Sequence, residues 1–112
     1  MQWSEVSSDQ HELWRRTFNA EPDVEDLSAG CPLCAEPALH RWYHLDGQDE
    51  VHLSGRRYLG HGRLWEWCAA CGSFEYFGDG FVPDWWRSDL VVADELLTWS
   101  PMAVEESRRR AP

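Results

Sequence analysis

Four cysteines are the residues of this chain whose type and spacing point most directly to chemistry. They form two Cys-X-X-Cys pairs, Cys31 with Cys34 and Cys68 with Cys71, and 33 residues separate the pairs. Each pair presents two sulfurs from one tight turn, and two such turns facing each other supply the four tetrahedral ligands of a structural zinc ion. Because four sulfurs leave no position for water, we expect this zinc to stabilise the fold and not to catalyse a reaction.

The residues next to the cysteines strengthen this interpretation. Gly72 follows Cys71, so the second turn resembles the CxxCG zinc knuckle of zinc-ribbon and rubredoxin-like proteins. Glycine readily adopts the positive φ that turns backbone amides toward the sulfurs. The first turn matches the CPxC opening of these proteins, but Ala35 stands where glycine is usual. The resemblance covers about residues 28 to 78 and implies a small zinc-ribbon protein without implying an activity.

Other uses of the four thiols stay open from the sequence. A thioredoxin-like redox pair needs a Cys-X-X-Cys at the start of a helix that follows a strand, and neither pair lies in such a pattern. A rubredoxin-type iron site uses the same ligands as zinc. Two disulfides would need an oxidising compartment, whereas the first residues contain no secretory signal.

Length and charge limit the remaining possibilities. With 112 residues we expect a single domain over 1–112, with a leading helix (1–20), the ribbon (28–78) and a C-terminal wrap and helix (79–112). The 20 acidic residues exceed the 10 basic ones, which gives a formal net charge of −10. This charge disfavours nucleic acid and favours a basic protein partner. No apolar stretch is long enough for a membrane span, and we expect a cytoplasmic protein. All the basic residues are arginine, which is typical of a GC-rich bacterial coding sequence.

Hydrophobic patterning predicts a small α+β fold. Ser7 and Gln10 fit a capping box for the leading helix, which should end near Asn19. Alternating side chains predict strands over residues 39–45, 64–68 and 73–77, which we expect to form a three-stranded antiparallel sheet. The glycines near 78–80 predict a turn that ends the third strand.

The C-terminal part is predicted to be helical. Ser88 is a candidate N-cap for a helix that runs to about Trp99, although two adjacent valines weaken this prediction. Ser100 and Pro101 resemble a second N-cap and first turn, followed by Glu and Arg residues at the spacing of helical ion pairs. Together with the leading helix, these segments should flank the ribbon.

Tryptophans and acidic loops are the candidate partner-binding residues. The chain has eight tryptophans, and adjacent Trp85 and Trp86 cannot easily both point into the core, so one of them is a candidate interface anchor. Asp46, Asp49 and Glu50 lie in a predicted loop where they would attract a basic partner.

These features predict a non-enzymatic zinc-binding module for protein–protein interaction. Small acidic proteins of this character are similar to immunity proteins, which neutralise toxins that are often basic. One alternative is a nucleic-acid-associated ribbon that uses Arg56, Arg57 and Arg63 as a local basic patch. The other is a rubredoxin-like or thiol redox protein centred on the cysteines.

Overall fold

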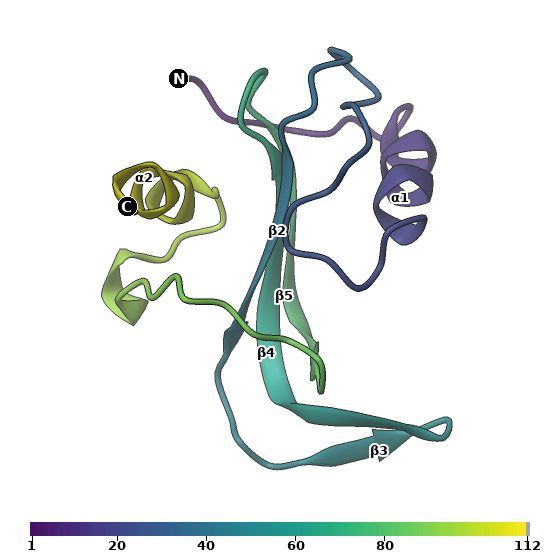
Figure 1. Ribbon diagram of the computed structural model, residues 1–112, viewed down its shortest axis with the longest axis vertical. Coiled ribbons are helices and arrows are strands. Elements are labelled where there is room, and N and C mark those ends of the chain that lie inside the picture. The colour runs from purple at the N-terminus through teal and green to yellow at the C-terminus, as the bar shows by residue number, and fades with distance from the viewer. Residues whose placement is uncertain (112) are drawn as a thin grey trace.

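The computed structural model describes residues 1–111 and contains one β-sheet, two α-helices and one short 3-10 helix (Figure 1). In chain order the elements are β1 (Ser4–Glu5), α1 (His11–Asn19), β2 (Leu39–Leu45), β3 (Val51–Leu53), β4 (Arg56–Cys68), β5 (Ser73–Pro83), the 3-10 helix η1 (Asp94–Leu96) and α2 (Met102–Arg110). No helix within residues 1–111 is both long enough and apolar enough to span a membrane.

The sheet has five strands and mixed pairing, in the order β1-β5-β4-β2, with β3 added alongside β4. Strands β2, β4 and β5 form the predicted antiparallel core, but β1 runs parallel to β5. The prediction of a purely antiparallel three-stranded sheet is therefore wrong. Strand β1 has only two residues, which is too short for an alternation pattern to reveal.

Strand β2 has the predicted bounds, whereas β4 and β5 are longer than predicted. The glycines at 60, 62, 78 and 80 lie inside these strands, where the register shifts, and so they mark bulges and bends instead of ends. At Gly60 a Cβ atom would collide with the Gly47 backbone in the loop after β2, and at Gly62 with the His44 carbonyl oxygen of β2. Glycine at position 60 allows that loop to pass close to the bent strand. The hairpin of β3 and β4 turns away from the rest of the sheet (Figure 1).

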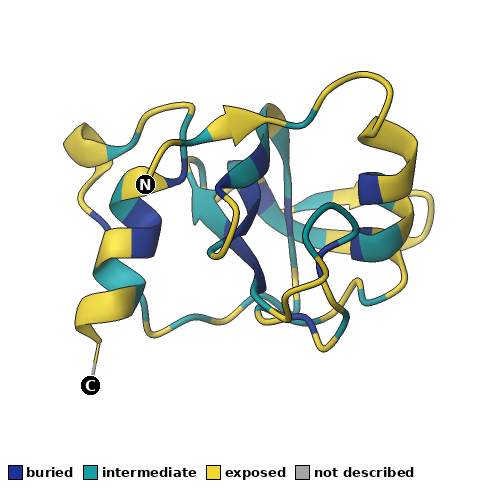
Figure 2. Ribbon diagram, turned by 90° about the horizontal axis from the view of Figure 1, so that it is seen from above, coloured by how far each residue is buried: buried dark blue, intermediate teal, exposed yellow. Residues whose placement is uncertain are grey.

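The two α-helices lie on opposite faces of the sheet (Figure 1). On one face, Trp14 and Phe18 of α1 pack with Leu27, Leu39 and two of the cysteines. On the other face, four aromatic side chains of the strands pack with Val104 of α2 and with Val92 of the segment before it: Trp42, Trp65, Trp67 and Phe74. Figure 2 shows the buried positions gathered along the strands and on the inner sides of both helices.

Helix α1 ends at Asn19, as predicted, but begins only at His11. The Ser7 hydroxyl donates to the Gln10 side chain at 3.2 Å, and no side chain caps the helix N-terminus. The predicted capping box is therefore absent from α1. Ser4 and Glu5, which the predicted leading helix included, instead form β1 and pair with β5.

The predicted helix from Ser88 to Trp99 is wrong, since η1 is the only helical turn in that segment. The chain is instead irregular and packs beside β2, where Trp42 Nε1 donates to the Leu90 carbonyl at 3.2 Å, and Ser88 Oγ donates to Glu25 at 2.8 Å. The adjacent β-branched residues Val91 and Val92 disfavour a helix in this segment. Helix α2 follows Ser100 and Pro101, as predicted.

A buried ion-pair network joins α1 to the sheet. Glu66 of β4 is fully buried and accepts hydrogen bonds from Arg41 Nε, at 2.9 Å, and from Arg15 of α1. The Arg41 guanidinium also donates to three backbone carbonyls at the end of α1 and in the connector that follows, those of Phe18, Glu21 and Val24. These charges are satisfied on every side, as buried charges must be.

A second buried carboxylate, Glu105 of α2, lies against the other face. It accepts from Trp67 Nε1 at 2.8 Å and from Arg108 and Arg109. Burial alone would raise the pKa of the Glu105 carboxyl, but the hydrogen bonds from Arg108 and Trp67 outweigh burial and hold that pKa below its ordinary value. The ionised form is therefore favoured in the folded protein.

Candidate metal centre

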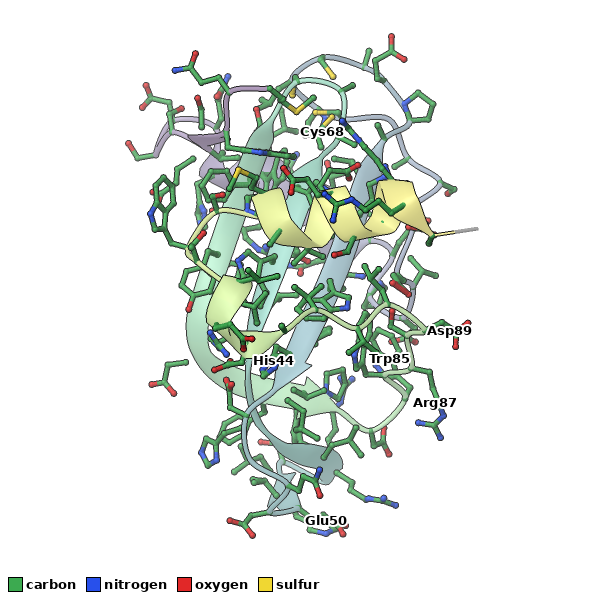
Figure 3. All side chains as sticks on the ribbon, turned by 90° about the vertical axis from the view of Figure 1, so that its left-hand side faces the viewer. His44, Glu50, Cys68, Trp85, Arg87 and Asp89 are labelled. Carbon is green, nitrogen blue, oxygen red and sulfur yellow. The ribbon has the colours of Figure 1, made fainter. Side chains whose placement is uncertain are left out.

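The fold brings the four cysteine sulfurs together at one end of the sheet, where Cys68 lies in Figure 3. All four Sγ atoms lie within 4.8 Å of one another, and the Cys31–Cys71 and Cys34–Cys68 separations are 3.9 and 3.7 Å. Four ligands at about 2.3 Å from a tetrahedral zinc lie about 3.8 Å apart. The sulfur positions therefore fit a tetrahedral metal ion.

Two different turns supply these ligands. Cys31 and Cys34 lie in the connector before β2, whereas Cys68 ends β4 and Cys71 lies in the tight turn before β5. Pairing of Leu39 with Cys68 in the β2–β4 ladder sets the two turns side by side, and the Ala69 amide donates to the Ala38 carbonyl at 2.8 Å. The sheet register thus positions the centre.

Backbone amides point at the sulfurs in both turns. The Leu33 N–H donates to Cys31 Sγ at 3.4 Å, and the Cys34 amide faces the same sulfur. In the second turn the amides of Ala70 and Cys71 face Cys68 Sγ. These donors stabilise thiolates, the form in which cysteine binds a metal.

Both turns close with a residue at positive φ. Gly72 has a φ of 79° and Ala35 a φ of 71°, so the first turn adopts the glycine-type conformation although it carries a Cβ. The left-handed conformation costs a residue with a Cβ roughly 1–2 kcal/mol. At Gly72 a Cβ would lie 2.4 Å from the Gln2 carbonyl oxygen, because the chain just before β1 crosses this turn. Glycine is therefore required at Gly72 for space as well as for conformation.

The centre has one buried side and one open side. Cys31 and Cys68 are buried in the core against α1, whereas Cys71 is exposed. Burial raises the pKa of the Cys31 and Cys68 thiols. Burial would also raise the pKa of Cys71, but hydrogen bonding with Ser73 outweighs it and lowers that pKa to about 7. The buried thiols stay protonated without a metal, so metal binding must release protons.

The alternative uses of the thiols find less support in this geometry. Neither Cys-X-X-Cys pair begins a helix, the position that activates a redox cysteine. None of the four cysteines forms a disulfide in the structure. Zinc and iron share this ligand set, so the arrangement fits either ion.

A second cluster of ligand-type side chains is already neutralised by an arginine. His44, Asp46 and Asp94 bring three ligand atoms within 4.8 Å of one another. The Arg63 guanidinium lies among them, 2.8 Å from Asp46 and 2.6 Å from Asp94. The hydrogen bond from Arg63 lowers the pKa of Asp46. Burial of that carboxyl acts in the opposite direction, and a hydrogen bond with His44 adds to the lowering. In this structure the cluster is an ion-pair network, with Arg63 supplying the positive charge.

The acidic residues predicted to bind a partner do not form one surface. Asp46 is engaged by Arg63, and Glu50 lies 3.0 Å from Arg57 and also contacts His52. Glu50 is at the opposite end of the molecule from Cys68 (Figure 3). Asp49 is exposed in the loop between β2 and β3.

The predicted aromatic anchors, Trp85 and Trp86, are half-buried. Both rings pack on Tyr43, with centroid separations of 6.3 and 5.1 Å. The exposed tryptophan is instead Trp99, whose side chain is 55% exposed although its ring lies near that of Phe74. Its position in an irregular segment offered no periodic signal that would have distinguished it.

The predicted basic patch is also partly neutralised. Arg63 and Arg57 are engaged by carboxylates, which leaves Arg56 as the patch residue without an ion pair among the described residues.

Comparison of the chain with protein-family models, with curated proteins and with solved structures gave no match. What the structure establishes is a small α+β chain whose four cysteines lie close enough together to bind one metal ion.

Proposed function

We propose that this chain is a non-enzymatic zinc protein in which one structural zinc ion, bound by the four cysteines, holds a protein-binding domain together. The observation that carries the proposal is the set of sulfur separations, which match a tetrahedral tetrathiolate site. The zinc would join the connector before β2 to the β4–β5 turn. A structural zinc site contributes on the order of 10 kcal/mol to folding, enough to dominate the stability of a small domain.

Metal analysis tests the zinc proposal directly. We expect the purified protein to be colourless, to contain one zinc per chain and to lose near-UV circular dichroism when a strong chelator removes the metal. Cys34→Ser should lose both metal and fold. Ser8→Ala is the control, since Ser8 is exposed before α1 and its replacement leaves all four sulfurs and their hydrogen-bond partners in place. Bound iron with the visible absorption of a rubredoxin-type site would refute zinc, and a chain folded equally well without metal would refute the structural role.

The second part of the proposal is that the surface binds a basic protein, as an immunity protein that neutralises a basic toxin would. A net charge of −10 steers a positively charged partner toward the chain. Exposed apolar side chains supply contact area: Met1 is 62% exposed, Trp99 55% and Met102 49%. Met1 and Met102 line the same shallow hollow, so apolar surface from the two chain ends is joined there.

Affinity capture from a native host tests the partner. We expect the zinc-loaded protein to retain a basic protein whose capture weakens as salt is added. Trp99→Ser should reduce capture, whereas Leu53→Ser, which removes an apolar side chain of 44% exposure at the remote hairpin, should not. Recovery of nucleic acid alone, or of no protein, would refute this part of the proposal and leave the zinc result unaffected.

A further inference from the structure

Strand β5 has an outer edge that the chain leaves largely open. All along its inner edge β5 pairs with β4, but on its outer side β1 pairs with Ser73 and Phe74 only. The last bond of this pairing runs from the Val6 N–H to the Phe74 carbonyl at 2.9 Å. Because backbone groups alternate along a strand, the Tyr76 N–H and carbonyl also face outward. Within residues 1–111, no other strand pairs with this edge.

The opposite edge of the sheet, formed by β2, is partly paired with the connector that precedes it. The outer side of β2 is closed by the chain itself: the Arg41 N–H donates to the Glu25 carbonyl at 2.7 Å and the Leu27 N–H to the Leu39 carbonyl at 3.0 Å. Farther along, the Trp42 side chain of β2 donates to the Leu90 carbonyl at 3.2 Å, so the segment through Leu90 packs against that strand. Proteins usually cover or interrupt such edges because unpaired amides and carbonyls recruit another strand. The first half of the β2 edge is closed here by the connector before it, whereas the edge of β5 beyond Phe74 offers a place for a strand.

A bulge divides the open edge and limits what can pair with it. The register between β4 and β5 shifts at Gly78 and Asp79, which together oppose one residue of β4. Bulges of this kind oppose the indefinite edge-to-edge pairing that leads to aggregation. The groups available for a short added strand therefore lie around Tyr76 and, beyond the bulge, around Phe81.

The surroundings of this edge are acidic. Where β1 stops, a hollow of about 90 Å³ opens beside β5, and Glu5 and Glu75 are among its lining residues. Farther along, Asp79 is exposed and forms no ion pair with any described residue. Glu75 is engaged by His11 and Arg15, whereas Glu5 is exposed. The edge thus offers backbone hydrogen bonds together with carboxylates that are available to a cationic side chain.

We propose that the open edge of β5 binds an extended, basic segment of a partner protein, which joins the sheet as a further strand. This proposal rests on the proposed function and specifies its mode of recognition. Backbone hydrogen bonds would provide affinity, and alternate Lys or Arg side chains would meet Glu5 and Asp79. A second copy of this chain fits poorly, because pairing of two β5 edges would join two chains that each carry a net charge of −10.

The experiment uses the full zinc-loaded chain, isotope-labelled for NMR, and three short synthetic peptides. The first alternates lysine and threonine, the second has glutamate in place of lysine, and the third is the lysine peptide N-methylated at alternate residues. We expect the lysine peptide to shift the amide signals of residues 75–82 and to slow hydrogen exchange of the Tyr76 amide. N-methylation removes backbone donors and should weaken binding at least about tenfold.

Matched charge variants complete the test. Asp79→Lys should weaken binding of the lysine peptide severalfold, whereas Glu95→Lys, the same change on exposed η1, should weaken it much less. Equal binding of the glutamate peptide, shifts outside β5, or self-association through this edge would overturn the proposal. Capture of a basic protein whose cross-links map away from β5 would also overturn it while leaving the proposed function intact. A lysine peptide that binds at β5 when no host protein is captured would support the edge and refute the proposed function.

Discussion

The sharpest structural prediction concerns the buried carboxylate of Glu66. Replacing it with glutamine keeps the shape of the side chain but removes the negative charge that balances Arg41 and Arg15. The Glu66 side chain is 1% exposed and that of Arg41 is 3% exposed, so water cannot replace the lost interaction. Breaking a buried pair in this way costs about 3–5 kcal/mol because a charge is left uncompensated.

Urea denaturation of the zinc-loaded protein measures this cost. With a slope near 1.5 kcal/mol per molar urea, Glu66→Gln should lower the unfolding midpoint by roughly 2–3 M without changing the slope. Glu12→Gln on α1 is the matched control, since Glu12 is 88% exposed and its pair with Arg16 spans 3.4 Å. An exposed pair of this type contributes no more than about 0.5 kcal/mol.

The outcome that would refute this reasoning is a Glu66→Gln midpoint close to that of Glu12→Gln. That result would mean that Arg41 is held by its three carbonyl partners alone and that the carboxylate adds little. Replacement of both Glu66 and Arg41 by apolar residues should not restore stability. The three backbone carbonyls would lose the Arg41 donor, and each buried carbonyl without a hydrogen bond costs about 1–3 kcal/mol.

Three further predictions concern the turns and the second buried carboxylate. Ala35→Gly should raise the free energy of unfolding by roughly 0.5–1 kcal/mol in urea titrations, since it relieves the positive φ, whereas Ala29→Gly should lower it. Gly72→Ala should destabilise the chain by more than about 1 kcal/mol and increase hydrogen exchange in β1, because the new methyl group would displace Gln2. The lowered pKa of Glu105 contributes stability above the unfolded value of about 4.3, and this stability is lost as the pH falls through the folded pKa. Glu105→Gln should therefore be less stable than the wild type near neutral pH, and the difference should shrink below about pH 4; a constant difference across the titration would contradict the assignment.

The sequence predicted those parts of the fold that local patterns determine. Strand β2 has the predicted bounds because its side chains alternate between the two faces of the sheet. The cysteine spacing predicted the association of the two turns, although 33 residues separate them. Both results depend on features that a short window of sequence contains.

What the sequence did not predict depends on distant parts of the chain. Strand β1 exists because β5 is available for it to pair with, and its two residues carry no pattern of their own. The segment from Ser88 to Trp99 is not an α-helix because it packs against Trp42 of β2, a tertiary contact that overrides the helix signals. Trp85 and Trp86 pack on Tyr43 for the same reason: the chain after β5 returns past that strand.

The parallel pairing of β1 with β5 has a consequence for the order of folding. Strands β2, β4 and β5 are neighbours in sequence and can assemble through short loops, but β1 must wait for a partner that is made much later in the chain. Since α1 follows β1 after a short connection, late pairing of β1 with β5 should also delay the packing of α1 on the sheet. We therefore expect refolding to pass through a metal-bound meander whose Trp14 and Phe18 are still in water, and the last kinetic phase to report the arrival of the N-terminal segment.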